Sequence, residues 1–131
     1  MPRMVTTMLM FQGGVAEKAM NRYVSLFPGS GIGRVERYGP GEGVEGAIKT
    51  ARFTLAGREF ICFDSPIKHD FTFTPSISIF VDCESEAELT TAFGQLAEGG
   101  QVLMPLDNYG FSAKFGWVND SFGVSWQLNL E

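Results

Sequence analysis

Apolar and polar residues follow two different periods in the first half of the chain. In residues 15–27 the apolar side chains recur three or four positions apart, with charged and amide side chains opposite, which predicts one amphipathic helix. Pro28-Gly29 ends that helix. Apolar runs and alternating patterns predict strands around it. These strand segments are residues 6–12, residues 31–39, and a hairpin over residues 47–65 that turns at an Ala-Gly-Arg sequence.

The same order of patterns returns in the second half. Residues 76–83 alternate and predict a strand, with the hydroxyls of Ser76 and Ser78 on one side. Ser85 with Glu88 three positions later is the signature of a capping box, which opens a second amphipathic helix that ends at a Gly-Gly pair. The strand-like segments that follow are residues 101–106, 110–120 and 122–130, the last two joined by a turn at Asn119-Asp120.

The predicted element order is therefore strand–helix–strand–strand–strand, and it occurs twice along the chain. With 131 residues the chain is long enough for one domain with a real core. We predict a single domain over 1–131, with one module at about 5–66 and another at about 74–131. The two halves share this order but little sequence, so the repeat is one of architecture.

Composition narrows the class of protein. Apolar residues make up 44% and charged residues 19%, which is typical of a globular protein. The net charge of −5, without a cluster of Lys and Arg, argues against a nucleic-acid partner. No segment reaches the length of a membrane span, and the first apolar run is too short for a signal peptide. We therefore expect a cytoplasmic protein without membrane contact, in which Cys62 and Cys83 are buried thiols.

The Gly29-Ser30-Gly31-Ile32-Gly33 segment looks like a nucleotide-binding loop. Such a loop must follow a strand and open a helix, because the phosphate binds the free N–H groups and the positive dipole end of the helix. Here a helix runs into the segment and a strand leaves it. The sequence therefore predicts a helix end and a turn, and no nucleotide cofactor.

Few residues form a recognisable catalytic set. His69 is the single histidine and lies in a polar loop without an evident orienting partner. Asp64 and Asp82 each end an apolar strand, where a carboxylate usually caps or solvates a loop. Cys62 has no histidine beside it in the sequence to lower its pKa, which favours a core residue over a nucleophile.

Aromatic residues concentrate in the last third of the chain. Phe115 and Trp117 lie on one side of a predicted strand, and Trp126 lies on the next. Two tryptophans on a hairpin suit the wall of an apolar pocket, and they equally suit a core or a dimer face. These alternatives stay open at the level of the sequence.

Several segments together resemble a known family. They are FQGGVAEKAMNRYVSLFPGSGI, FTLAGREFICFDS, LAEGGQVLMPL and KFGWVNDSFGVSWQLNL. The chain resembles the PhnB-like proteins, also labelled the demethylubiquinone methyltransferase-type domain, of the glyoxalase/bleomycin-resistance (vicinal oxygen chelate) superfamily. The resemblance covers nearly the whole chain. It implies an α+β fold of two βαβββ modules, with a curled mixed sheet around a cleft, and a homodimer.

The resemblance also implies positions for a divalent metal in the superfamily's enzymes. Carried over to this chain, they fall near Met8, Cys62, Ser76 and Trp126, where the superfamily usually has His, Gln or Glu. Met, Cys, Ser and Trp offer almost none of the oxygen and imidazole donors that such an ion prefers. We therefore expect neither a metal nor another cofactor.

The expected function is the binding of an apolar or aromatic small molecule by a metal-free protein. The expected cleft residues are Met8, Met10, Cys62, Ser76, Phe115, Trp117 and Trp126. One alternative is a metal-dependent enzyme of the same superfamily, and another is a dimeric interaction module without a ligand. Whether any reaction is catalysed stays open, and methyltransferase activity is not expected, because the glycine segment stands in the wrong context for a nucleotide.

Overall fold

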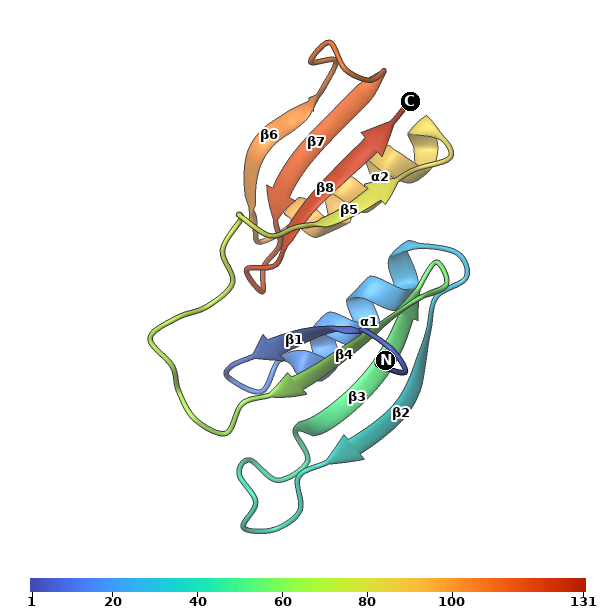
Figure 1. Ribbon diagram of the computed structural model, residues 1–131. Coiled ribbons are helices and arrows are strands. Elements are labelled where there is room, and N and C mark those ends of the chain that lie inside the picture. Colours follow the sequence, from blue (N-terminus) through green and yellow to red (C-terminus); the bar gives the residue numbers. More distant parts are fainter. The chain divides into compact units, whose positions relative to one another are not determined.

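The protein is described by a computed structural model that covers residues 1–131. The chain divides into two compact units, Met1–Asp70 and Phe71–Glu131, which we call unit 1 and unit 2. Each unit consists of one helix and one four-stranded sheet (Figure 1). No helix has both the length and the apolar character needed to cross a membrane.

Unit 1 runs strand–helix–strand–strand–strand. Its elements are β1 (Thr7–Phe11), α1 (Ala16–Leu26), β2 (Gly31–Arg37), β3 (Ile48–Leu55) and β4 (Arg58–Asp64). The sheet order is β1-β4-β3-β2, with β1 parallel to β4 and the other pairs antiparallel. The β3–β4 hairpin turns at Ala56 and Gly57, whose φ angles of 47° and 87° lie in the left-handed region. That turn geometry matches the twist of the two strands.

Unit 2 repeats this plan. Its elements are β5 (Ile79–Asp82), α2 (Glu86–Ala97), β6 (Gln101–Asp107), β7 (Lys114–Asn119) and β8 (Ser125–Leu130). The sheet order is β5-β8-β7-β6, with β5 parallel to β8 and the other pairs antiparallel. The predicted α+β class with two βαβββ modules is confirmed, and each module has its own open, mixed sheet.

Several strands are shorter than predicted, among them β7 and β8, which begin only at Lys114 and Ser125; the first strand of unit 2 is the case that affects a predicted site residue. The predicted strand over 76–83 begins only at Ile79, so Ser76 and Ser78 lie before it. Pro75 has no N–H to give to a ladder, and Ile77 N–H donates to Thr74 O at 3.4 Å, which closes a turn over this segment. Ser76 Oγ lies 2.7 Å from Thr74 Oγ1, so its hydroxyl is engaged locally in that turn.

The core of each unit lies between the helix and one face of its sheet. Helix α1 packs against β2, β3 and β4, and α2 packs against β6, β7 and β8. The glycine segment that follows α1 is a helix end and a turn, as predicted: Gly29 has a φ of 74°, and β2 begins at Gly31. The fully buried large side chains include Phe11, Met20, Tyr23, Ile48 and Phe53 in unit 1, and Leu89, Leu96, Val118, Trp126 and Leu128 in unit 2.

Candidate functional site

Each sheet has one face that no helix of its unit covers, which we call the open face. In unit 1 the register places Met8 beside Ile61 and Ile61 beside Arg52, in one row across β1, β4 and β3. The next row contains Met10 and Phe63. Met8 is 56% exposed, and Met10 is half-buried. Both methionines expected to line a cleft therefore belong to the open face of unit 1.

Cys62 lies on the opposite, helix-covered face of this sheet. It is fully buried, and its Sγ lies 3.9 Å from Met20 Sδ of α1. Burial, with a smaller contribution from the nearby Asp64 carboxylate, raises the pKa of the Cys62 thiol from 9.0 to about 12. Because successive side chains of a strand alternate between faces, Cys62 is separated from the open face by a single position.

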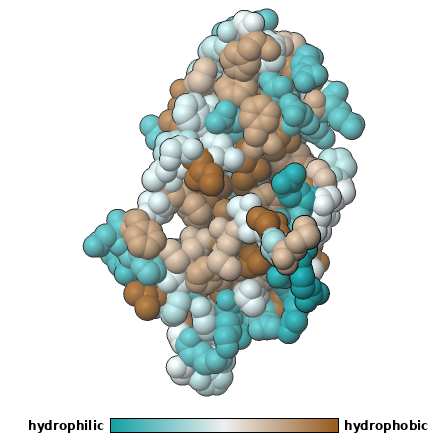
Figure 2. Space-filling view, viewed as in Figure 1, coloured by the Kyte–Doolittle hydropathy of each residue, from teal (hydrophilic) through white to brown (hydrophobic).

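The open face of unit 2 is formed by a second set of aligned rows. Phe80, Gln127 and Trp117 lie side by side across β5, β8 and β7, while Asp82, Asn129 and Phe115 form the next row. Of the residues predicted for a cleft, Phe115 and Trp117 belong to this face. Figure 2 shows that apolar side chains reach the viewed surface in several places and are interrupted by hydrophilic ones.

An aromatic cluster surrounds Phe115 on this face. The ring of Phe115 lies 5.0 Å from that of Phe111, 6.2 Å from that of Tyr109 and 6.4 Å from that of Phe80, measured between centroids. Phe115 is only 4% exposed, whereas Phe80 and Phe111 are 54% and 64% exposed. The cluster therefore has a buried centre and an exposed rim, and edge-to-face ring pairs hold it together.

A chain of polar groups runs beside the aromatic rings. Trp117 Nε1–H donates to Ser125 Oγ at 2.8 Å, and Ser125 Oγ lies 2.6 Å from Ser78 Oγ. Gln127 Nε2–H donates to Ser78 Oγ at 3.1 Å. Sequence reasoning missed Ser125 and Gln127. The signal for both was their position on either side of Trp126 in β8, which places them on the opposite face from that tryptophan.

Two buried acceptors on the open face of unit 2 have no hydrogen-bond partner. They are Oδ1 of Asn119 and Oδ1 of Asn129. The amide of Asn129 is anchored at its other end, because Nδ2–H donates to Asp82 Oδ1 at 3.0 Å. Since buried polar atoms are normally paired, these two oxygens are unsatisfied acceptors of this face.

Trp126 lies on the helix-covered face of β8 and is fully buried. Its Nε1–H donates to Asp120 Oδ2 at 3.0 Å. The other oxygen of that carboxylate accepts the N–H groups of Phe122 and Val124, at 2.9 and 3.0 Å. Asp120 was expected only as a turn residue, and it also fixes the indole of Trp126 in the core of unit 2.

The four positions carried over for a metal offer poor donors in this structure. Cys62 is a buried, protonated thiol, and the Trp126 indole donates rather than accepts. Within either unit, no three His, Cys, Asp or Glu side chains are grouped so that they could hold an ion. His69 is held by two residues that follow β1 and β4: its Nε2 is 3.0 Å from Ser65 Oγ, and its backbone N–H donates to Gln12 Oε1 at 2.7 Å.

The thiols of both cysteines are free and buried, as predicted. Burial also raises the pKa of the Cys83 thiol, to about 11, and the nearby Glu88 and Asp82 carboxylates add to this effect. Neither thiol lies in the electropositive surroundings that activate a nucleophilic cysteine.

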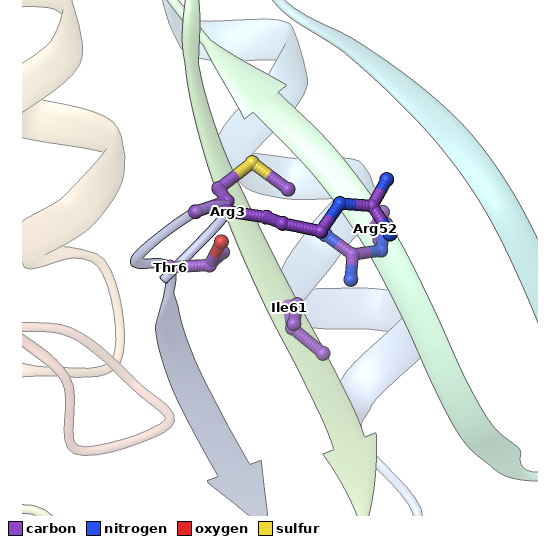
Figure 3. A pocket seen from close by; sticks show the side chains of 5 residues that line it. Arg3, Thr6, Arg52 and Ile61 are labelled. Atoms are coloured by element: carbon purple, nitrogen blue, oxygen red, sulfur yellow. The ribbon is translucent and has the colours of Figure 1, made fainter. Parts of the chain in front are cut away.

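Unit 1 contains a pocket of about 780 Å³ on its open face. It is lined by the segment before β1 and by the neighbouring strands, through Arg3, Met4, Thr6, Arg52 and Ile61. Figure 3 shows the side chains of Arg3 and Arg52 among those that line this pocket. None of these five lining residues was among the cleft residues expected from the sequence.

The chain is similar to one known family and to several solved structures. The family described as 3-demethylubiquinone-9 3-methyltransferase matches residues 3–129. A PhnB protein from Bacillus cereus is 53% identical, with 98% of this chain and 100% of that chain covered and a TM-score of 0.95. Protein PA1353 from Pseudomonas aeruginosa is 29% identical, with 99% and 98% covered and a TM-score of 0.82.

More distant structures share the fold. A glyoxalase/bleomycin resistance protein/dioxygenase from Nocardioides is 18% identical, with 99% of this chain and 85% of that chain covered and a TM-score of 0.54. At that identity the likeness concerns the fold alone. No curated protein matched the chain.

Proposed function

The chain belongs to the PhnB-like family of the glyoxalase/bleomycin-resistance superfamily, and we propose that it binds an aromatic small molecule on the open face of unit 2. The observation that carries this proposal is the aromatic cluster around Phe115, which has a buried centre and an exposed rim. A flat apolar ligand can add one more ring to such a cluster by stacking or edge-to-face contact.

The polar groups of the same face support a ligand that also donates a hydrogen bond. The unpaired Oδ1 atoms of Asn119 and Asn129 would accept an N–H or O–H group, which removes the cost of leaving a buried acceptor unsatisfied. The Trp117 indole is already held by Ser125, so it provides a rigid wall. The proposed ligand is therefore an aromatic compound that bears a hydroxyl or amino group.

We propose that the protein binds this aromatic compound without a nucleotide cofactor and without a metal. A nucleotide phosphate needs the N-terminal end of a helix, and Gly29–Gly33 instead follows the carbonyl-rich end of α1. The proposed function therefore does not include methyl transfer from a nucleotide-type cofactor. Metal-dependent chemistry would need donors other than those at the four carried-over positions.

The two tryptophans provide a direct test, because they lie on opposite faces of one sheet. We would titrate the Trp126→Phe variant, which keeps Trp117, with a library of phenols and anilines and follow the indole fluorescence. We expect saturable quenching at one site per chain, because the ligand contacts Trp117. In the matched Trp117→Phe variant, the remaining Trp126 signal should stay constant.

Two outcomes would overturn this function. One is a fluorescence that stays flat in both single-tryptophan variants across the whole library. The other is an equal response of Trp126 and Trp117, which would indicate a general effect on the fold rather than contact at the open face. Phe111→Ala, which removes part of the exposed rim, should weaken binding and leave the far-ultraviolet circular dichroism unchanged.

We also infer a cytoplasmic homodimer. The free thiols of Cys62 and Cys83 are typical of a reducing compartment, and the exposed rim of the aromatic cluster would be partly covered in a dimer. Sedimentation of the full chain tests the oligomeric state. If Trp117→Ala dissociates the dimer and no library compound binds, the alternative of an interaction module without a ligand replaces the proposed function.

A further inference from the structure

We propose that the pocket of unit 1 is a second binding site, for an organic acid whose carboxylate lies between Arg3 and Arg52. The pocket has a volume of about 780 Å³, which lies within the ordinary range of about 300–1,000 Å³ for small-molecule sites. The proposal concerns the other unit and a different ligand chemistry, so it does not rest on the proposed aromatic site.

The charge of Arg3 has no partner within the protein. Arg3 precedes β1, and the structure gives its guanidinium neither a hydrogen bond nor an ion pair, although it lines a pocket with a second arginine (Figure 3). A guanidinium carries five N–H donors in a planar fork that matches the two oxygens of a carboxylate. An anion between the two side chains would relieve the repulsion of two like charges.

Arg52 is held in place for such a contact. Its Nη1–H donates to Glu59 Oε1 at 2.7 Å, and this pair fixes the side chain on the open face of the sheet. One N–H of the fork is used in that bond, and the others remain for a ligand. Glu59 also neutralises part of the charge, so Arg3 supplies the excess positive charge of the pocket.

The remaining lining favours an apolar body on the acid. Met4 is 57% exposed, Ile61 is half-buried, and Met8 stands beside Ile61 in the same row with 56% of its surface exposed. Flexible methionine side chains adapt to ligands of irregular shape. Thr6 contributes a hydroxyl to the lining. A small inorganic anion would leave this apolar surface uncovered, whereas an aliphatic or aromatic acid would bury it.

The test is calorimetric titration of the full chain with octanoate and with 1-octanol, which share a tail and differ in the charged head group. We expect octanoate to bind at least about tenfold more tightly, because a charge-assisted hydrogen bond is stronger than a neutral one. Arg3→Gln and Arg52→Gln should each weaken octanoate binding by about tenfold and reduce the difference between the two probes. Arg3 has no internal partner, so its replacement leaves the fold intact.

Arg34→Gln is the matched control. Arg34 lies on β2, its side chain is 79% exposed, and it pairs with Glu36 at 2.6 Å, away from the pocket lining. This substitution changes the net charge by the same amount as Arg3→Gln. Because Arg34 does not line the pocket, octanoate binding should stay unchanged. Raising the salt concentration should weaken octanoate binding in the wild-type protein and have little effect on 1-octanol.

The proposal is overturned if 1-octanol binds as tightly as octanoate, or if Arg3→Gln has no effect. Inorganic phosphate that binds as tightly as octanoate would overturn the assignment of an organic acid, because the apolar lining would then contribute nothing. The outcome is independent of the tryptophan experiment. Quenching of Trp117 by phenols together with an inert Arg3 would preserve the aromatic site and remove the acid site, and the reverse pattern would do the opposite.

Discussion

Units 1 and 2 share one topology and begin their helices by different means. In unit 2, Ser85 Oγ accepts the N–H of Glu88 at 3.1 Å, and Glu88 Oε1 accepts the N–H of Glu84 at 3.1 Å. These bonds are local in the sequence. In unit 1, the N-cap residue Val15 has no side-chain hydrogen bond, and the carboxylate of Asp64 takes over that role from the end of β4.

Asp64 does more than cap a helix. Its Oδ1 accepts Ala16 N–H at 2.8 Å and its Oδ2 accepts Ile48 N–H at 2.9 Å, so one buried carboxylate ties α1 and the start of β3 to β4. The comparison teaches that the same requirement, pairing the first N–H groups of a helix, is met by local or by long-range contacts. The long-range solution makes the helix depend on the completed sheet.

The largest expected effect comes from Asp64→Ala. The substitution leaves two buried backbone N–H groups unpaired and removes bonds to a charged acceptor, so we expect a loss of about 4 kcal/mol in the free energy of unfolding. Urea unfolding of the full chain, followed by circular dichroism, measures the loss.

Ser85→Ala is the comparison variant in unit 2. Removal of a local N-cap costs about 1 kcal/mol, because water can reach the exposed end of α2. If Ser85→Ala proves as destabilising as Asp64→Ala, the distinction between a local and a long-range cap is wrong.

An intermediate effect is expected where α2 packs closely on its sheet. A Cβ on Gly116 would lie 2.5 Å from Phe93 Cε2 and 2.7 Å from Leu106 Cδ2, so the aromatic ring would have to move. In unit 1 the corresponding contact of α1 with β3 involves side chains such as Ala51 and Phe53. We expect Gly116→Ala to lower the free energy of unfolding by about 2 kcal/mol.

The same substitution at Gly94 is the control for this prediction. Gly94 lies within α2, and a Cβ there meets nothing within 4 Å. Because alanine favours a helix over glycine, Gly94→Ala should raise the free energy of unfolding by about 0.5–1 kcal/mol. Thermal denaturation of the two variants should therefore shift in opposite directions, and a shared direction would contradict the close packing at Gly116.

The smallest expected effect is the pH dependence of stability that comes from the thiols of the two units. The pKa values of Cys62 and Cys83 are raised from 9.0 to about 12 and about 11, so each folded thiol stays protonated where the unfolded one ionises. Their contribution to stability is complete below pH 9 and is lost as the pH rises through the folded pKa. Between pH 9 and 10 we expect a loss of about 1 kcal/mol or less for each thiol.

Urea unfolding at pH 8, 9 and 10 measures this dependence. Cys62→Ala and Cys83→Ala should each make the alkaline decrease shallower, whatever their effect at pH 8. An unchanged decrease in both variants would assign it to other groups, such as tyrosines and lysines.

The sequence was informative wherever the determining contacts were local. The N-cap at Ser85, the helix end at Pro28-Gly29 and the hairpin turn before Arg58 are encoded by neighbouring residues, and the structure has all three elements. The predicted capping box differs in one bond, because the Glu88 carboxylate accepts the N–H of Glu84 rather than that of Ser85. The strand over 76–83 was overextended, because its alternation was read without the turn that Thr74 and Ile77 close.

The faces of two strands were harder to predict. Cys62 and Trp126 were placed with the cleft residues, yet each lies under the helix of its unit, while Ile61 and Gln127, one position away, lie on the open faces. A one-residue shift reverses the direction of a side chain, and apolar residues on both faces of β4 and β8 weaken the alternation that would reveal it.

Local periodicity and turn chemistry by themselves determined the element order, the two modules and the absence of a nucleotide-type loop, because each depends on residues within a few positions of one another. Tertiary structure alone decided which strand residues share a face, that Asp64 holds α1 from 48 residues away, and that Arg3 and Arg52 line one pocket. Those relations depend on strand pairing and on the direction of buried side chains, which arise only when distant segments pack together.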